Sequence, residues 1–168
     1  MDGILNTIAS AIWFILPAYF ANAAPVVLGG GPPVDMGKKF LDGRRIFGDG
    51  KTTHGFVGGL IVGTIVGLLQ GIAEAPLGEH LLLGFLLALG ALLGDLASSF
   101  IKRRLSIERG GAAPGLDQLG FVVVALILAS PVKLPTWQTI AVILIITPPI
   151  HLATNFVGHK LGLKSRPY

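Results

Sequence analysis

Long uncharged segments, mostly apolar, alternate along this chain with short charged segments. The uncharged runs cover residues 3–34, 52–73, 80–94, 118–132 and 134–159. A helix rises about 1.5 Å per residue and needs about 20 residues to cross a hydrocarbon core of about 30 Å, so the first, second and fifth runs are long enough. The pattern predicts one all-α transmembrane domain over residues 1–168, with about five helices near 4–24, 54–73, 81–101, 117–131 and 136–159.

The third and fourth runs reach a spanning length only when an acidic residue is included in each helix. Counted from the far side, Leu81 to Asp95 covers about 21 Å and Ser130 back to Asp117 covers about 20 Å. Both carboxylates should therefore lie at one depth, about 10 Å inside one face of the membrane. An acid at that depth is costly unless it is paired, hydrated or bound to a cation.

The basic residues predict the orientation. All thirteen Lys and Arg residues except Lys133 lie in the loops near 29–53 and 102–116 or in the C-terminal tail, which carries Lys160, Lys164 and Arg166. The positive-inside rule then places the N-terminus outside and the C-terminus in the cytosol. We expect a multi-pass protein of the cell membrane whose polar cavity, with the two acids, opens to the cytosol.

Composition supports the bilayer as solvent and restricts the chemistry. Hydrophobic residues make up 52% of the chain and charged residues 13%, against roughly 25% charged in soluble domains. The absence of cysteine excludes disulfides, thiolate zinc sites and cysteine nucleophiles. The small residues at 21–24 resemble a signal-peptide cleavage site, but residues 1–3 carry no base, so we expect an uncleaved span.

Two spans carry packing signals. Glycine recurs every four residues from Gly55 to Gly71, which predicts close packing within the chain, with a homodimer seam as the alternative. Pro148 and Pro149 should kink the last span or break it into two half-helices. Trp137 is placed to anchor its outer end at the membrane interface.

The first basic loop is rich in glycine and charge. The GDGKT sequence at 48–52 resembles the end of a Walker motif, but Arg45 stands where its first glycine should be. Glycine-rich backbone beside Lys and Arg can instead form an anion-binding nest, in which Asp35, Asp42 and Asp49 orient the bases or bind a cation. A solvated basic loop resting on anionic lipid is the alternative.

The acids and the bases that follow them form the main candidate site. On a helix, Asp95, Ser98, Ser99 and Lys102 share one face, in a gradient that suits a metal-bound phosphate. Asp95 and Asp117 below two basic loops predict a site for Mg²⁺ and a polyphosphate. The alternatives are that the bases at 102–104 only anchor the helix and that Asp117 only caps its own. The four histidines lack zinc-site spacing and are expected to be structural.

Four segments in order resemble the archaeal CDP-archaeol synthase family over nearly the whole chain. They are LPAYFANAAPVV at 16–27, PVDMGKKFLDGRRIFGDGKTTHGF at 33–56, GDLASSFIKRR at 94–104 and LDQLGF at 116–121. The third and fourth segments also resemble the wider phosphatidate cytidylyltransferase group. This resemblance implies an integral membrane enzyme that joins CTP to 2,3-bis-O-(geranylgeranyl)-sn-glycerol 1-phosphate with Mg²⁺, giving CDP-archaeol and pyrophosphate.

The resemblance also implies roles for residues. Asp95 and Asp117 would bind the metal and, with Lys102, form the catalytic set. The substrate-binding set would be Lys38, Arg44, Lys51, Arg103, Asn22, Ser99, Asp42 and Asp49. The expected partners are CTP, a prenylated glycerol phosphate lipid and membrane lipids, with no nucleic acid and with a homodimer as one arrangement.

The sequence departs from the family at one position and leaves other functions open. Gly120 stands where the family commonly has a further acid, so a replacement would come from Asp35, Asp42 or Asp49. A small transporter or channel is the alternative function, because intramembrane acids and a proline-broken helix also mark ion pathways. A CDP-alcohol phosphotransferase is suggested by the Asp-Gly-Arg sequence at 42–44, but the rest of that motif does not follow.

Overall fold

The structure is a computed structural model that describes residues 2–164, which leaves Arg166 outside the described part. Six helices follow one another, and the described residues contain no strand. They are α1 (Asp2–Ala23), α2 (Pro25–Leu28), α3 (Thr53–Glu74), α4 (Leu77–Arg104), α5 (Leu116–Ala129) and α6 (Trp137–Lys160). The prediction of an all-α fold is confirmed.

Four segments of the described chain are long and apolar enough to cross a membrane. They are α1 with α2, α3, α4 and α6. The fourth predicted span corresponds to α5, which has only 14 residues and reaches about 21 Å. It is shorter than the predicted 117–131, because Ser130 and Pro131 already belong to the turn towards α6.

Of the two outcomes predicted for the last span, the break is wrong, because α6 is one helix through Pro148 and Pro149. The kink stays a prediction. Two adjacent prolines remove two backbone N–H donors, yet the turns on either side keep their own hydrogen bonds. Thr147 in the same turn adds a side-chain bond of 2.6 Å from its hydroxyl to the Ile143 carbonyl. The helix therefore reaches the loop end of the bundle without interruption.

The glycine stripe packs inside the chain, as predicted. All five of its glycines are buried in α3. A Cβ placed on Gly63 would lie 2.8 Å from the Pro17 carbonyl oxygen of α1, and one on Gly67 would lie 2.6 Å from the Gly84 Cα of α4. The backbones of α1, α3 and α4 thus meet with no room for a side chain.

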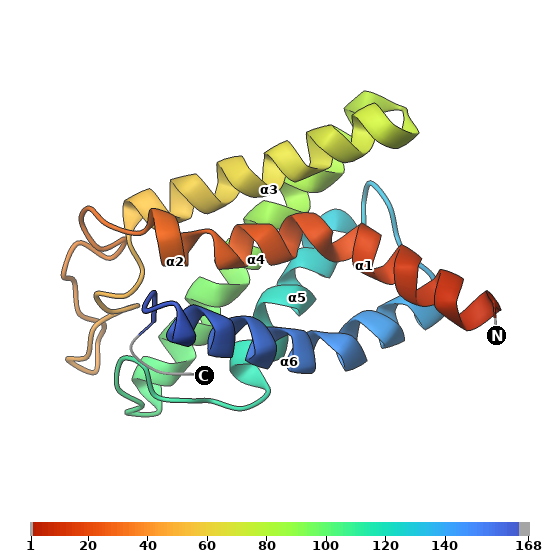
Figure 1. Cartoon of the computed structure of the whole chain (residues 1–168). Coiled ribbons are helices and arrows are strands. Elements are labelled where there is room, and N and C mark those ends of the chain that lie inside the picture. Colours follow the sequence, from red (N-terminus) through yellow and green to blue (C-terminus); the bar gives the residue numbers. More distant parts are fainter. Residues whose placement is uncertain (1, 165–168) are drawn as a thin grey trace.

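The remaining core joins α4 to α1, α5 and α6. Its fully buried members include Ile15, Leu87, Val122 and Ile143. Figure 1 shows both long loops and the end of α6 at one end of the bundle, with the N-terminus at the other. Lys133 in the α5–α6 turn lies 3.8 Å from Glu79 at the start of α4. These two segments lie away from the end of the bundle where the basic loops gather (Figure 1).

Candidate active site

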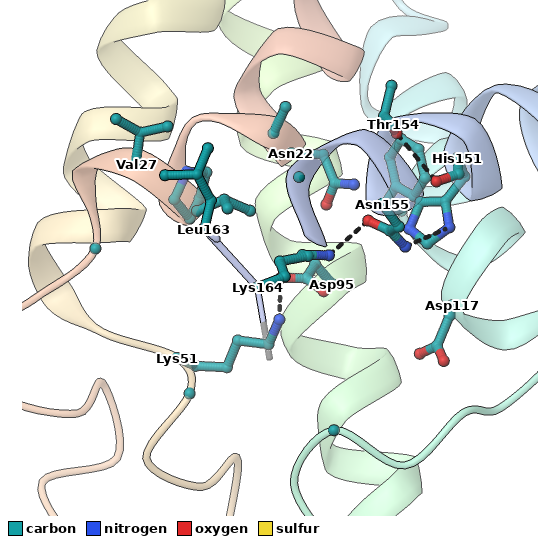
Figure 2. A pocket seen from close by; sticks show the side chains of 18 of the residues that line it. Asn22, Val27, Lys51, Asp95, Asp117, His151, Thr154, Asn155, Leu163 and Lys164 are labelled. Atoms are coloured by element: carbon teal, nitrogen blue, oxygen red, sulfur yellow. Dashed lines mark hydrogen bonds and ion pairs between the residues drawn. The ribbon is translucent and has the colours of Figure 1, made fainter. Parts of the chain in front are cut away.

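A cavity of about 830 Å³ lies at the loop end of the bundle, which is within the size range of small-molecule sites. It is lined by α1, α2, α4, α5 and α6, by both basic loops and by the turn after α6. Tyr19 and Thr147 lie within it, and their hydroxyls are 2.7 Å apart. Figure 2 shows the cavity, with Lys51, Asp95, Asp117 and Lys164 among the labelled side chains.

Both acids of the predicted site line this cavity, and each is paired with a lysine. The Lys51 ammonium donates to Asp95 Oδ2 at 2.5 Å, and the Lys102 ammonium donates to Asp117 Oδ1 at 2.8 Å. Asp117 Oδ2 also accepts a hydrogen bond of 2.8 Å from the Ala113 N–H, which ties it to the second loop. Asp95 is therefore neutralised from the first loop and not by the bases that follow it on α4.

Small residues bring α4 and α5 into contact near the two acids. A Cβ on Gly94 would lie 2.6 Å from the Gly120 carbonyl oxygen, so α4 and α5 touch backbone to backbone next to Asp95. A Cβ on Gly120 would collide with the Ser98 hydroxyl oxygen. A side chain at position 120 would therefore require the Ser98 hydroxyl to move.

The first loop is organised around Asp35, whose side chain is fully buried. Its carboxylate accepts N–H bonds of 3.1 Å from Gly37 and 2.9 Å from both Phe47 and Gly48, and it pairs with Arg45 Nη2 at 2.6 Å. Burial raises the pKa of Asp35, but the Arg45 guanidinium and the three N–H groups outweigh burial and hold this pKa well below its usual range. Asp35 is thus a structural residue, with no oxygen left for a substrate cation.

A smaller cavity of about 170 Å³ adjoins the first at Lys51 and Lys102 and is also lined by Ser99, Arg103 and Arg109. The Nε atom of Arg103 is buried and has no hydrogen-bond partner among residues 2–164. A buried guanidinium donor without a partner is costly. Arg103 also brings positive charge to the wall of this cavity, which suits an anion.

Most of the predicted site residues meet at these two cavities. The main cavity is lined by Asn22, Asp49, Lys51, Asp95, Lys102 and Asp117. Asp49 is the only one of the three candidate replacement acids that lines it, and it already pairs with Arg45 at 2.6 Å. Ser99 and Arg103 line the smaller cavity.

Three predicted substrate-binding residues lie outside both cavities. Lys38 is exposed on the loop. Arg44 donates to the main-chain carbonyl of Arg104 at 2.5 Å, and Asp42 pairs with Arg104 Nε at 2.9 Å. These contacts attach the first loop to the end of α4, which gives Arg44 and Asp42 a role in holding the loop.

Sequence reasoning missed the contribution of α6 and the turn after it. His151 and Asn155 line the main cavity, and the Asn155 amide lies 3.3 Å from His151 Nδ1. Lys164 lines it too and donates to Asn155 Oδ1 at 2.5 Å. The spacing of Thr147, His151 and Asn155, four residues apart in an apolar helix, was the signal that could have found them.

The donor set suits a magnesium ion that is shared with a phosphate. Residues 2–164 hold no group of three or more His, Cys, Asp or Glu side chains that could bind a metal. Mg²⁺ commonly takes only one or two carboxylates from a protein and completes its shell with water and substrate phosphates. Asp95 and Asp117 could supply those carboxylates, so the residues present fit the ion.

Comparisons with known proteins agree with the resemblance seen in the sequence. A family model described as CarS-like, CDP-archaeol synthase, matches residues 4–168. A CDP-archaeol synthase of Pyrococcus horikoshii is 54% identical over 169 residues, which cover 98% of this chain and 99% of that protein. One of Methanocaldococcus jannaschii is 45% identical, covering 92% and 94% respectively.

The fold has a solved counterpart as well. A structure reported as an intramembrane enzyme for archaeal membrane lipids biosynthesis has a TM-score of 0.82 and 44% sequence identity, covering 88% of this chain and 94% of that one. Together with the apolar helices, this match identifies a multi-pass membrane protein and sets aside the transporter alternative. The chain belongs to the CarS-like family of CDP-archaeol synthases.

Proposed function

We propose that this protein is a CTP-dependent cytidylyltransferase that converts 2,3-bis-O-(geranylgeranyl)-sn-glycerol 1-phosphate to CDP-archaeol and releases pyrophosphate. One observation carries the proposal beyond family membership. Asp95 and Asp117 are each paired with a lysine from a different segment, and both line one cavity at the end of the helix bundle where the basic loops gather.

The reaction joins two polyanions. An oxygen of the lipid phosphate attacks the α-phosphorus of CTP in line, and the bond from that phosphorus to the bridging oxygen of the β-phosphate breaks. Pyrophosphate leaves with the electron pair, and no covalent enzyme intermediate forms. The nucleophile is already ionised, so the barrier lies in charge repulsion and positioning and not in proton removal.

The side chains in the cavity are suited to that barrier. Lys51 and Lys102 each use one of three ammonium N–H donors on a carboxylate, which leaves donors for phosphate oxygens. Arg103 brings a further positive charge to the wall of the adjoining cavity. Bound Mg²⁺, held by Asp95 and Asp117, would neutralise charge on the phosphates and on the leaving pyrophosphate.

The walls of the cavity also suit a lipid. Val27, Val157 and Leu163 line it and are 67%, 54% and 48% exposed. Exposed apolar side chains beside the charged groups suit a substrate whose headgroup enters the cavity while its prenyl chains stay in the bilayer. The positive-inside rule supports a site on the cytosolic side, where CTP is available, because the basic loops gather at this end of the bundle.

Pyrophosphate release from CTP, in detergent micelles with and without the lipid phosphate, tests the proposal. Asp95→Asn and Asp117→Asn should each lower kcat at least about 100-fold, the loss typical when a group that stabilises charge in the transition state is removed. Glu79→Gln, an exposed acid at the far end of α4, is the control and should keep wild-type activity. Activity near wild type in either Asp variant, with unchanged melting temperature, would remove that residue from the site.

A further inference from the structure

The chain turns back on itself after α6. The N–H groups of Leu163 and Lys164 both donate to the Gly158 carbonyl, at 2.9 and 3.3 Å. The Lys164 carbonyl lies 3.0 Å from His159 Nδ1, which closes the turn from the other side. Gly162 has a φ of 73°, a conformation that favours glycine. This turn directs Lys164 towards the cavity instead of away from the bundle.

Lys164 enters the cavity without a carboxylate of its own. Each of the three acids that line the cavity is paired with another base, since Asp49 pairs with Arg45, Asp95 with Lys51 and Asp117 with Lys102. Within residues 2–164, Lys164 has no ion pair, and its ammonium bonds only the neutral Asn155 amide. Figure 2 shows this ammonium close to Asp95 and Lys51.

The surroundings of the Lys164 ammonium favour an anion as its binding partner. Burial lowers the pKa of Lys164, and the positive charge of Lys51 lowers it further, while the negative charges of Asp95 and Asp117 offset part of this shift. A partly buried ammonium with a neutral partner is costly unless an anion completes it. A phosphate among Lys164, Lys51 and Lys102 would neutralise all three cations.

Asn155 is itself held in place for this task. Its amide nitrogen is 3.3 Å from His151 Nδ1 and its amide oxygen accepts the Lys164 N–H at 2.5 Å. Asn155 is 7% exposed, so it is buried in the wall of the cavity. Because an ammonium can only donate, the Lys164 contact sets the amide oxygen towards Lys164, and the amide nitrogen then faces His151.

We propose that Lys164 is a phosphate-binding residue of the active site, positioned by Asn155 and His151. The assignment rests on the proposed function, in which both substrates carry phosphate. Either the nucleotide or the lipid headgroup could supply the phosphate that Lys164 binds, so the experiment distinguishes these two substrates.

Steady-state kinetics of purified Lys164→Ala, Lys164→Gln and Lys164→Arg test the proposal, with CTP and the lipid phosphate varied in turn. We expect Ala and Gln to raise KM for at least one substrate about 10- to 100-fold, the usual loss of a charge-assisted hydrogen bond. Arg should restore most of that loss. An increase confined to the lipid phosphate assigns Lys164 to the headgroup, and one confined to CTP assigns it to the nucleotide.

The control variant is Lys160→Ala. Lys160 is an exposed base of the same segment whose ammonium lies 5.3 Å from the Phe156 ring centroid, outside the cavity lining. It should leave both KM values unchanged. Asn155→Ala should raise the same KM as Lys164→Ala, by a smaller factor, and should add nothing in the Lys164→Ala background, because it acts through the lysine.

Several results would overturn the assignment. These are unchanged KM values in Lys164→Ala, an equal effect of Lys160→Ala, or loss of the folded protein in both the Ala and Gln variants, which would make Lys164 a structural residue. The wild type separates this failure from that of the proposed function. An inactive wild type refutes the function, whereas an active wild type matched by Lys164→Ala refutes only the role of Lys164.

Discussion

Replacing the buried carboxylate of Asp35 should open the first basic loop while leaving the helices intact. In Asp35→Asn the volume is kept, but the negative charge is lost and the new NH₂ group faces N–H donors. The groups affected are the N–H groups of Phe47 and Gly48, at 2.9 Å each, and the Arg45 guanidinium at 2.6 Å. The loop should therefore lose the contacts that hold its two segments together.

The size of this effect follows from the contacts. Hydrogen bonds to a charged group contribute about 1.5–3 kcal/mol each, and removing one member of a buried pair costs about 3–5 kcal/mol. Because the amide keeps one acceptor oxygen, we expect about 3 kcal/mol in favour of the open loop. At about 1.4 kcal/mol per tenfold, the open population should rise roughly 100-fold.

Limited trypsin digestion in micelles measures this opening, since the loop contains Lys38, Lys39, Arg44 and Arg45. Cleavage within the loop should accelerate roughly 100-fold in Asp35→Asn, because cleavage follows the open population when opening is fast. Glu79→Gln removes an exposed acid at the other end of the molecule and should not change the rate. Cleavage within twofold of the wild type would refute the view that Asp35 holds the loop.

Three further predictions concern the same loop and the helix contacts. The pKa of the Asp35 carboxyl is lowered from 3.8, so the stabilisation of the loop by this group is complete above that pH and is lost as the pH falls towards the folded-state pKa. Protection of the wild-type loop in hydrogen exchange should therefore decrease below about pH 4. Asp35→Asn should show no such decrease. Gly67→Ala should destabilise the protein by about 1–3 kcal/mol, because the new Cβ would overlap Gly84. Gly78→Ala is the control and should keep the wild-type melting temperature, because its Cβ meets open space. Equal melting temperatures of the two variants would contradict the packing of α3 on α4. Gly120→Ala should lower the melting temperature through its collision with Ser98, and adding Ser98→Gly should recover at least half of that loss; no recovery would show that the collision is not the cause.

The spans and the two acids could be predicted because they depend on local and additive signals. Uncharged length fixes where a helix can cross lipid, and a count of 1.5 Å per residue places Asp95 and Asp117 near one depth. The glycine period of α3 likewise reports a close contact without identifying the partner helix. These signals do not need knowledge of the tertiary structure.

The pairing of charges could not be predicted in this way. Lys51 reaches Asp95 across 44 positions in the sequence, and Asp35 collects its donors from both ends of a loop that has no periodic pattern. His151 was expected to be structural and Asn155 was not singled out, because neutral polar residues do not interrupt an apolar run. Lys164 was counted only as a tail charge, since its return depends on the turn after α6.

CTP labelled at either the α- or the γ-phosphate tests the central claim most directly. Purified protein in micelles with the lipid phosphate and Mg²⁺ should transfer the α-label to an organic-soluble product and release the γ-label as pyrophosphate. Both events should be at least about 100-fold slower in Asp95→Asn. Transfer of the γ-label to the lipid, or consumption of CTP without a labelled lipid, would contradict cytidylyl transfer at the Asp95–Asp117 site.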